Sequence, residues 1–135
     1  MENCKESWIG DLHQRTDIRA ILTLLNNGGT MADIDLFNIS FPKGKKSQVR
    51  VWLLYENQKL IAWSVADNSD VMNYGIGKKQ GETGIYVFVA PIQRGKGYGK
   101  LLANKAIEFA RLNDWNPKGF AHSVSGRLFY ANLGI

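Results

Sequence analysis

The sequence predicts an α/β fold with a mixed sheet flanked by helices, and three observations support this prediction. Residues 48–55 and 60–66 are rich in β-branched, aromatic and aliphatic side chains, which is typical of two paired strands. Residues 85–90 are apolar on both faces of an extended chain, as expected of a central strand. Apolar residues recur at helical spacing within 16–25 and 97–112, so amphipathic helices come before and after these strands.

The length and composition are those of one globular domain. The chain has 135 residues, of which 44% are hydrophobic and 21% charged, so a single domain spanning residues 1–135 can bury one core. No apolar run approaches the roughly 20 residues of a membrane-spanning helix, and the N-terminus lacks the basic and apolar blocks of a signal peptide. We therefore expect a soluble, cytoplasmic protein. Its one cysteine, Cys4, has no neighbouring ligands, so we expect neither an internal disulfide nor a metal site.

The chain is basic, with a formal net charge of +5. Part of the excess is local, because basic residues cluster at Lys43, Lys45, Lys46 and Arg50 and again at Lys78 and Lys79. Such a balance favours an anionic ligand or partner, either a phosphorylated cofactor or a nucleic acid. A solvated basic surface explains the 43–50 cluster equally well.

The N-terminal third is predicted to be mainly helical. Residues 8–9 can supply a short strand, and a helix begins behind a cap at residues 16–17. Residues 26–29 end this helix, whose inward face carries Ile18, Ile21, Leu22 and Leu25. A second, shorter helix is expected within 30–41, with Thr30 as its cap and Ile34 and Phe37 facing inward.

The middle of the chain is predicted to contain the sheet. A reverse turn at 56–59 joins the 48–55 and 60–66 strands, which therefore pair antiparallel. Residues 67–83 form a long loop or a weak hairpin, and long loops inside compact domains are often functional. Pro91 ends the central strand.

The C-terminal part is predicted to be helix, strand and helix. The first helix begins near Gly97 and ends at 113–117, and its buried face carries Leu102, Ala106, Phe109 and Ala110. Residues 119–122 form a short strand. Ser123 or Ser125 caps the last helix, whose inward residues are Leu128, Phe129 and Leu133.

Gly95, Gly97 and Gly99 alternate between the central strand and the helix that follows it. Glycines let the backbone bend tightly, and the N–H groups and dipole of a helix N-terminus attract phosphate. The dinucleotide fingerprint G-x-G-x-x-G is not satisfied, because neither register has a glycine at its sixth position. A Walker A loop is not satisfied either, because Leu101 stands where that motif needs Ser or Thr.

The pattern Arg94-x-x-Gly97-x-Gly99 follows a strand that ends in Val89-Ala90-Pro91, and it opens an amphipathic helix. In this setting it resembles the acyl-CoA-binding segment of the GNAT superfamily of N-acetyltransferases, whose signature is Gln/Arg-x-x-Gly-x-Gly/Ala. The resemblance implies acetyl-CoA as cosubstrate, with its pyrophosphate held by Arg94, Gly95, Lys96, Gly97, Tyr98, Gly99 and Lys100. It also implies a bulge that splays the central strand, so that backbone N–H groups of Phe88 and Val89 align pantetheine and polarise the thioester carbonyl.

A second resemblance lies at the C-terminus. Residues 128–135, Leu-Phe-Tyr-Ala-Asn-Leu-Gly-Ile, are similar to the family ending Leu-Tyr-Glu-Lys-x-Gly-Phe, with Tyr130 at the tyrosine. Upstream the match is looser, since Ser123 and Gly126 stand where the family commonly has Asn and Ala. The order of elements over 16–135 also agrees with the family. The resemblance implies direct attack by a primary amine in a ternary complex, with Tyr130 protonating the departing thiolate as general acid; a packed helix aromatic is the alternative role.

The general base is less clearly indicated. Glu82 comes just before the central strand, near where some members of the family carry a catalytic glutamate. Asp70, Tyr86 and His122 are other titratable candidates, and many members of the family use ordered water.

One departure from the family affects partners. Members normally continue past the Gly-Phe ending into two more strands, whereas this sequence ends at Ile135. We therefore expect a GNAT-like, mostly antiparallel sheet that lacks the last two strands and has an open edge near 119–122. Exposed edges are usually covered, so we expect a second copy of the chain, forming a homodimer, or another protein to lie there.

Other functions stay open at this stage. The chain can be a catalytically inactive CoA-binding or protein-interaction module on the same fold. Alternatively, the 43–50 cluster recruits RNA or DNA, and the acceptor is a nucleic-acid-linked amine. The acceptor can equally be a protein N-terminus, a lysine, a polyamine, an aminoglycoside-like amine or an amino acid. Its pocket is expected to be lined from 26–42 and 67–84.

Overall fold

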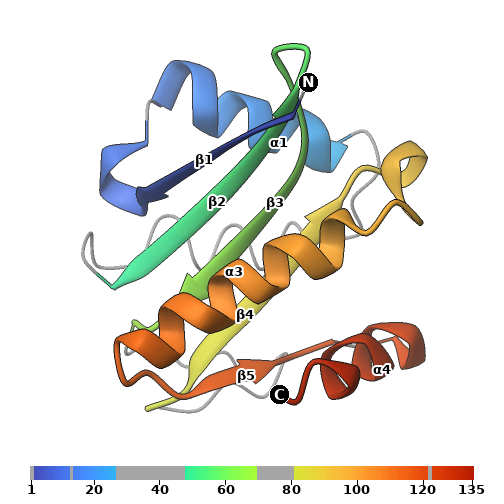
Figure 1. Cartoon of the computed structure of the whole chain (residues 1–135). Coiled ribbons are helices and arrows are strands. Elements are labelled where there is room, and N and C mark those ends of the chain that lie inside the picture. Colours follow the sequence, from blue (N-terminus) through green and yellow to red (C-terminus); the bar gives the residue numbers. More distant parts are fainter. Residues whose placement is uncertain (1, 13, 27–47, 70–80, 122) are drawn as a thin grey trace.

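Five strands form one sheet with helices on both faces (Figure 1). The computed structural model describes residues 2–12, 14–26, 48–69, 81–121 and 123–135. The strands are β1 Glu2–Trp8, β2 Val49–Glu56, β3 Lys59–Asp67, β4 Thr83–Val89 and β5 Pro117–Gly119. The α-helices are α1 Arg19–Asn26, α3 Tyr98–Leu112 and α4 Val124–Asn132. Shorter helical segments are η1 Ile9–Asp11, the π-helical η2 Gln14–Ile18 and η3 Pro91–Gln93.

The sheet order is β1-β2-β3-β4-β5, the same as the order in the sequence. The first four strands are antiparallel to their neighbours, and only β5 is parallel to its neighbour β4. Helix α3 makes the crossover between these two parallel strands. The prediction of a mixed, mostly antiparallel sheet with helices is therefore confirmed.

Strands β2 and β3 form an antiparallel hairpin, as the sequence predicts. Its two turn residues, Asn57 and Gln58, have positive φ values of 50° and 67°. Left-handed conformations at both positions are typical of a tight hairpin turn, and the Asn at the first position tolerates them well.

Side chains of the strands alternate between two cores, one on each face of the sheet. On one face Ile21, Leu24 and Leu25 of α1 pack over a buried set that includes Val51, Leu53, Val65 and Phe88. On the other face Leu102, Ala106 and Ala110 of α3 pack over Trp52, Ala62, Ala66 and Ile85. A fully buried leucine such as Leu102 contributes about 2 kcal/mol through removal of its surface from water. These cores fix the position of the β4–α3 connection.

Several local predictions differ from the structure. The short strand expected at 119–122 lies earlier, at Pro117–Gly119, and the cap expected at 16–17 lies inside η2. The N-terminal strand is longer than residues 8–9, because its polar residues pair in register with β2 as an edge strand, from Glu2↔Glu56 to Trp8↔Arg50. Leu22 and Leu128 were expected to face inward but are 40% and 58% exposed. The covered face of α1 is centred on Ile21 and Leu25, and that of α4 on Tyr130, so these two leucines lie at the margins.

The predicted bulge of the central strand is not seen in its pairing with β3. That register runs without a shift from Asp67↔Gly84 to Ala62↔Val89. The one register shift between β2 and β3 lies at Leu54/Tyr55. The parallel pairing of β4 with β5 instead covers only three residues and ends at Ile85↔Gly119. The two strands part beyond this point because β5 is short.

Strand β5 is the last in the sheet order, so its outer edge has no strand partner within the described residues. On the adjoining helix α4, Val124 and Leu128 are 71% and 58% exposed. A second copy of the chain or another protein covering this edge stays a prediction. The second predicted helix at 30–41 and most of the 67–83 loop lie outside the described residues.

Candidate functional site

The glycine-rich turn connects the end of β4 to the start of α3. After Val89 the chain forms η3, and then Gly95 and Gly97 take left-handed conformations with φ of 83° and 87°. Gly97 is the residue that precedes the first turn of α3, with φ 87° and ψ 3°. Any other residue at these two positions would be strained, so the turn requires the glycines that the sequence supplies.

The N-terminus of α3 offers backbone donors to a ligand. The first hydrogen bond of the helix runs from Leu101 N–H to Gly97 O at 3.0 Å, so the N–H groups of Gly99 and Lys100 come before any intrahelical acceptor. A Cβ atom added at Gly95 or Gly97 would meet nothing within 4 Å. The space beside these two glycines is therefore open, and the side chains of Lys96 and Lys100 are exposed. Open space, backbone donors and cations together fit a phosphate group.

The edge of β4 that faces away from β3 is open beyond Ile85. Ala90 N–H donates to Ile61 O at 2.8 Å, so the alternation of an antiparallel ladder directs the N–H of Phe88 to β3 as well. The N–H groups of Val87 and Val89 point the other way, toward the side that β5 has left. Of the two residues expected to offer N–H groups, Val89 thus faces the gap and Phe88 does not. Val87, which the sequence interpretation did not include, joins Val89 there.

Arg94 closes the upper end of this edge. Its Nε atom donates to Val89 O at 3.0 Å, and its guanidinium lies 5.7 Å from the ring centre of Phe88. Lys96 is held by Gln93, with Nζ 2.9 Å from Oε1. Tyr98 donates its hydroxyl to Glu56 Oε2 at 3.4 Å, which turns this side chain toward the β2–β3 hairpin. The predicted residues 94–100 therefore surround one turn, with Arg94 directed back along β4.

Tyr130 is the one residue of α4 that is buried, at 7% exposure. Its ring lies directly on Gly119 of β5: an added Cβ at Gly119 would lie 2.2 Å from Tyr130 Cγ. Ser123 caps α4 by accepting the N–H of Gly126 at 3.0 Å, which fixes the register of the helix. Gly119 is paired with Ile85, the last residue of β4 that pairs with β5. Tyr130 is thus seated where β4 and β5 part.

The neighbouring Phe129 extends the same wall toward the glycine turn. Its ring atoms would lie 3.7 and 3.8 Å from a Cβ added at Gly99. The Phe129 and Tyr130 rings contact edge to face, with centroids 5.1 Å apart. Helix α4 therefore lines one side of the gap from the start of α3 down to the end of the β4–β5 pairing.

Tyr86 is a second buried phenol close to Tyr130. Burial raises its pKa far above the usual value, and the nearby Asp67 carboxylate and the Tyr130 phenol raise it further. Asp67 is itself buried and accepts hydrogen bonds from Ser69, with the backbone N–H at 2.9 Å and the hydroxyl at 2.5 Å. Tyr86 therefore keeps its proton at neutral pH, which argues against it as the general base.

The other candidates for a base are only partly described. Glu82 directly precedes β4, at the end of the strand opposite the glycine turn. Val87 is five positions further along the strand, or about 16 Å away at the usual rise. Asp70 and His122 lie outside the described residues, as do most of the positions expected to line the acceptor pocket. Within the described parts no group of three His, Cys, Asp or Glu side chains could hold a metal ion.

The basic cluster expected to attract nucleic acid is described only at Arg50. Its Nε lies 3.3 Å from Glu6 Oε1, and its guanidinium stacks at 4.8 Å over Trp8 and 5.2 Å over Phe109. This side chain therefore joins β1 to α3. Its other members, Lys43, Lys45 and Lys46, lie outside the described residues, as does the separate cluster of Lys78 and Lys79.

Two residues of the site were missed from the sequence, and a signal exists for each. The two-residue period of a strand, counted back from the Pro91 stop, would have paired Val89 with Val87 instead of Phe88. Gly119 carries weaker information, because a glycine in a short strand indicates only that something approaches the backbone closely.

No helix in the described residues is long and apolar enough to cross a membrane.

Comparison with known proteins gives one family and a set of similar folds. The sequence profile of the Acetyltransferase (GNAT) family matches residues 20–122. No curated protein matches the chain. Among solved structures, Escherichia coli ElaA superposes with a TM-score of 0.73 at 17% identity, over 98% of this chain and 86% of that one.

Two further solved structures have similar folds. An acyl-CoA N-acyltransferase from Pseudomonas aeruginosa has a TM-score of 0.70 at 15% identity, over 99% of this chain and 88% of that one. A predicted acetyltransferase from Clostridium acetobutylicum, whose crystal structure is with acetyl-CoA, has a TM-score of 0.62 at 20% identity, over 100% of this chain and 90% of that one. At these identities the likeness concerns the fold alone.

Proposed function

Because the chain belongs to the GNAT family of acetyltransferases, we propose that it is an N-acetyltransferase that transfers an acetyl group from acetyl-CoA to a primary amine. One observation supports the proposal most strongly. The open edge of β4 begins at the glycine turn and ends at Tyr130, so the turn, two backbone N–H groups and a tyrosine lie along one gap. The similar fold of the Clostridium protein, whose structure is with acetyl-CoA, supports the choice of cosubstrate.

The residues assigned to acetyl-CoA divide between two tasks. The backbone of Gly95, Gly97 and Gly99 and the cations of Lys96 and Lys100 hold the pyrophosphate at the start of α3. The N–H groups of Val87 and Val89 hold the pantetheine arm and donate to the thioester carbonyl. A preorganised donor of this kind contributes roughly 3 kcal/mol to transition-state stabilisation.

Bound acetyl-CoA supplies an activated acyl carbon and a thiolate leaving group. Cys4, the one cysteine, is half-buried on β1, which is separated from β4 by two strands, so it does not relay the acetyl group. We therefore assign direct attack by the acceptor amine. Tyr130 donates its phenolic proton to the departing sulfur, so that CoA leaves as the thiol.

The proton lost by the attacking amine needs an acceptor. Tyr86 is unsuitable because burial raises its pKa and keeps it protonated. Glu82 stays our candidate, and its position at the far end of β4 requires water to carry the proton to its carboxylate.

The proposal is tested by thiol release from acetyl-CoA in the presence of an amine panel, with Tyr130→Phe as the diagnostic variant. The panel contains a peptide with a free N-terminus, a peptide with an acetylated N-terminus and a free lysine side chain, spermidine, an aminoglycoside and an amino acid. We expect amine-dependent release with at least one acceptor, and a kcat about 100-fold lower in Tyr130→Phe. Phenylalanine keeps the ring on Gly119, so the Kd for acetyl-CoA should stay within about twofold.

Two results would contradict this proposal. Acetyl-CoA binding without thiol release for any amine would favour a binding module on the same fold. An unchanged kcat in Tyr130→Phe would leave transfer intact but remove Tyr130 as the acid.

A further inference from the structure

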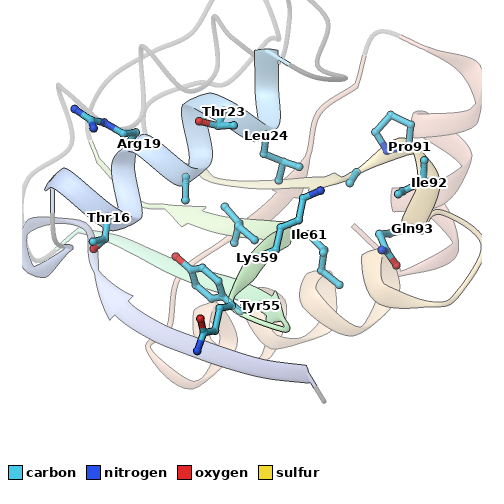
Figure 2. Close-up of a pocket in the computed structure, with 14 residues that line it drawn as sticks. Thr16, Arg19, Thr23, Leu24, Tyr55, Lys59, Ile61, Pro91, Ile92 and Gln93 are labelled. Atoms are coloured by element: carbon cyan, nitrogen blue, oxygen red, sulfur yellow. The ribbon is translucent and has the colours of Figure 1, made fainter.

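A pocket of about 670 Å³ lies beside the end of β4, on the α1 face of the sheet (Figure 2). Three separate segments line it: one side of α1, the end of the β2–β3 hairpin, and the chain just after β4. The described lining residues are Thr16, Arg19, Ala20, Thr23, Leu24, Tyr55, Gln58, Lys59, Leu60, Ile61, Ala90, Pro91, Ile92 and Gln93. This volume is within the range of small-molecule sites in proteins.

The pocket is separate from the proposed acetyl-CoA site. None of the residues of the glycine turn from Gly95 to Lys100 is among its described lining. Leu24, Leu60 and Ala90 belong to the core on the α1 face, whereas Val89, Tyr98 and Phe129 pack on the α3 face. The turn η3 runs between the two sites and forms a wall of the pocket.

Both charged groups among the described lining residues are positive. Lys59 extends across its middle, between α1 and the Pro91–Gln93 turn, whereas Arg19 lies at the rim on α1 with its guanidinium directed away from Lys59 (Figure 2). No carboxylate is among the described lining residues, and neither cation forms an ion pair within the described parts of the chain. Among the described residues the pocket thus has a central cation at Lys59 and a second cation at its rim, which favours an anion and disfavours an amine.

The acidic side chains closest in sequence to the lining are occupied elsewhere. Asp17 is buried and pairs with Lys5, with Oδ2 2.5 Å from Nζ, and it also accepts the hydroxyl of Tyr55 at 3.1 Å. Glu56 accepts the hydroxyl of Tyr98, which lies on the other face of the sheet. These contacts leave the positive charge of the pocket unneutralised by either carboxylate.

The remaining lining suits a ligand with an apolar body. Leu24 and Leu60 are buried side chains of the core on this face, at 7% and 5% exposure. Thr16, Thr23 and Gln58 are exposed, and their hydroxyl and amide groups surround this apolar surface. A ligand here can bury carbon atoms against the floor while an ionised group meets the cations.

From these observations we propose that this pocket binds a small organic anion, with an apolar body and one carboxylate or phosphate group, independently of acetyl-CoA. The carboxylate or phosphate lies at Lys59, with Arg19 adding to the positive potential. Tyr55, whose hydroxyl hydrogen is donated to Asp17, offers its oxygen only as an acceptor and so does not select an anion. Selectivity for negative charge therefore comes mainly from Lys59.

The test is ligand-observed NMR or calorimetry on the full chain with four matched probes: 3-phenylpropionate, phenyl phosphate, 3-phenylpropionamide and 3-phenylpropylamine. We expect at least one anion to bind about fivefold or more tighter than the neutral amide, the scale of one partly exposed charge pair, and the amine to bind weakest. The tighter anion identifies whether carboxylate or phosphate is preferred. Saturating CoA should not displace it.

Substitutions identify the cation responsible. Lys59→Met keeps the aliphatic stem and removes the charge, so it should weaken anion binding about fivefold while leaving binding of the neutral amide unchanged. Lys118→Met is the matched control, because it removes one exposed positive charge from β5, away from the pocket. It should leave anion binding unchanged.

Several results would overturn the proposal. Equal binding of the acid and its neutral amide would show an apolar pocket without anion selectivity. An equal loss in Lys118→Met would show a response to net charge alone. Displacement by CoA would show that the probe occupies the acetyl-CoA site, and tightest binding of the amine would reverse the predicted preference.

Discussion

Replacing Gly119 by alanine is expected to disturb Tyr130 without touching the glycine turn. The new Cβ would lie 2.2 Å from Cγ, 2.4 Å from Cβ and 2.5 Å from Cδ1 of Tyr130. Carbon atoms in contact are normally about 3.5 to 4.0 Å apart, so the buried ring or β5 must move by about 1.3 Å or more. Overpacking of this size costs about 1 to 3 kcal/mol of unfolding free energy.

The same displacement should slow catalysis. A catalytic group misplaced by about 1 Å can cost about 100-fold in rate, so kcat for acetyl transfer should fall by about that factor in Gly119→Ala. The Kd for acetyl-CoA should change by less than about threefold. Gly119 is paired with Ile85, whereas the glycine turn begins only after η3, beyond the other end of β4. Urea denaturation, calorimetry and thiol release measure the three quantities on one preparation.

Gly99→Ala is the matched control. Its Cβ would meet Val89 and Phe129 at ordinary distances of 3.6 to 3.8 Å, and alanine is the better helix former by about 0.5 to 1 kcal/mol. We expect stability equal to or above that of the parent protein, with catalysis retained. A Gly119→Ala variant as stable and active as the parent would refute the seating of Tyr130 on Gly119 and its role as acid.

Further predictions concern Tyr55, Cys4 and Glu82. Burial, then the charge of Asp17 and its hydrogen bond, raise the pKa of Tyr55 to about 12. The unfolded chain loses this proton near pH 10 while the folded one keeps it, so unfolding free energy should fall between about pH 10 and 12. Tyr55→Phe should remove that part of the fall in urea titrations, and an unchanged slope would contradict the assignment. Burial also raises the pKa of the Cys4 thiol, so a thiol reagent at pH 8 should label the folded chain about tenfold more slowly than the urea-unfolded chain. Glu82→Gln should lower kcat about tenfold without changing the Kd for acetyl-CoA, and no change would exclude it as the base.

Much of the fold could be predicted because local patterns specify it. The continuous apolar runs of β2, β3 and β4 and the helical period of α3 are each visible within one short segment of the sequence. The length of the N-terminal strand was underestimated because an edge strand carries polar residues on one face and is held mainly by its pairing with β2. The inward face of α4 was misjudged at Leu128, since a short helix with one buried residue, Tyr130, has no clear apolar period.

The candidate site was partly predictable for the same reason. The glycine turn is local, so its left-handed residues could be read directly from Gly95 and Gly97. Which N–H groups of β4 face the gap depends on the register with β3 and on where β5 ends, and neither is a local property. The anion pocket combines Arg19, Lys59 and Gln93 from three distant segments, and no period or motif relates them.

The central claim is that the turn around Gly97 holds the pyrophosphate of acetyl-CoA. A side chain at this position meets nothing within 4 Å, so Gly97→Glu should fold, at a cost of about 1 to 2 kcal/mol for its left-handed backbone. Its carboxylate would extend into the open side of the turn and repel phosphate. We predict that calorimetry detects micromolar binding of acetyl-CoA and CoA, and none of NADH, to the parent protein, and no binding of any of the three to folded Gly97→Glu. Undiminished acetyl-CoA binding in the variant would contradict the account.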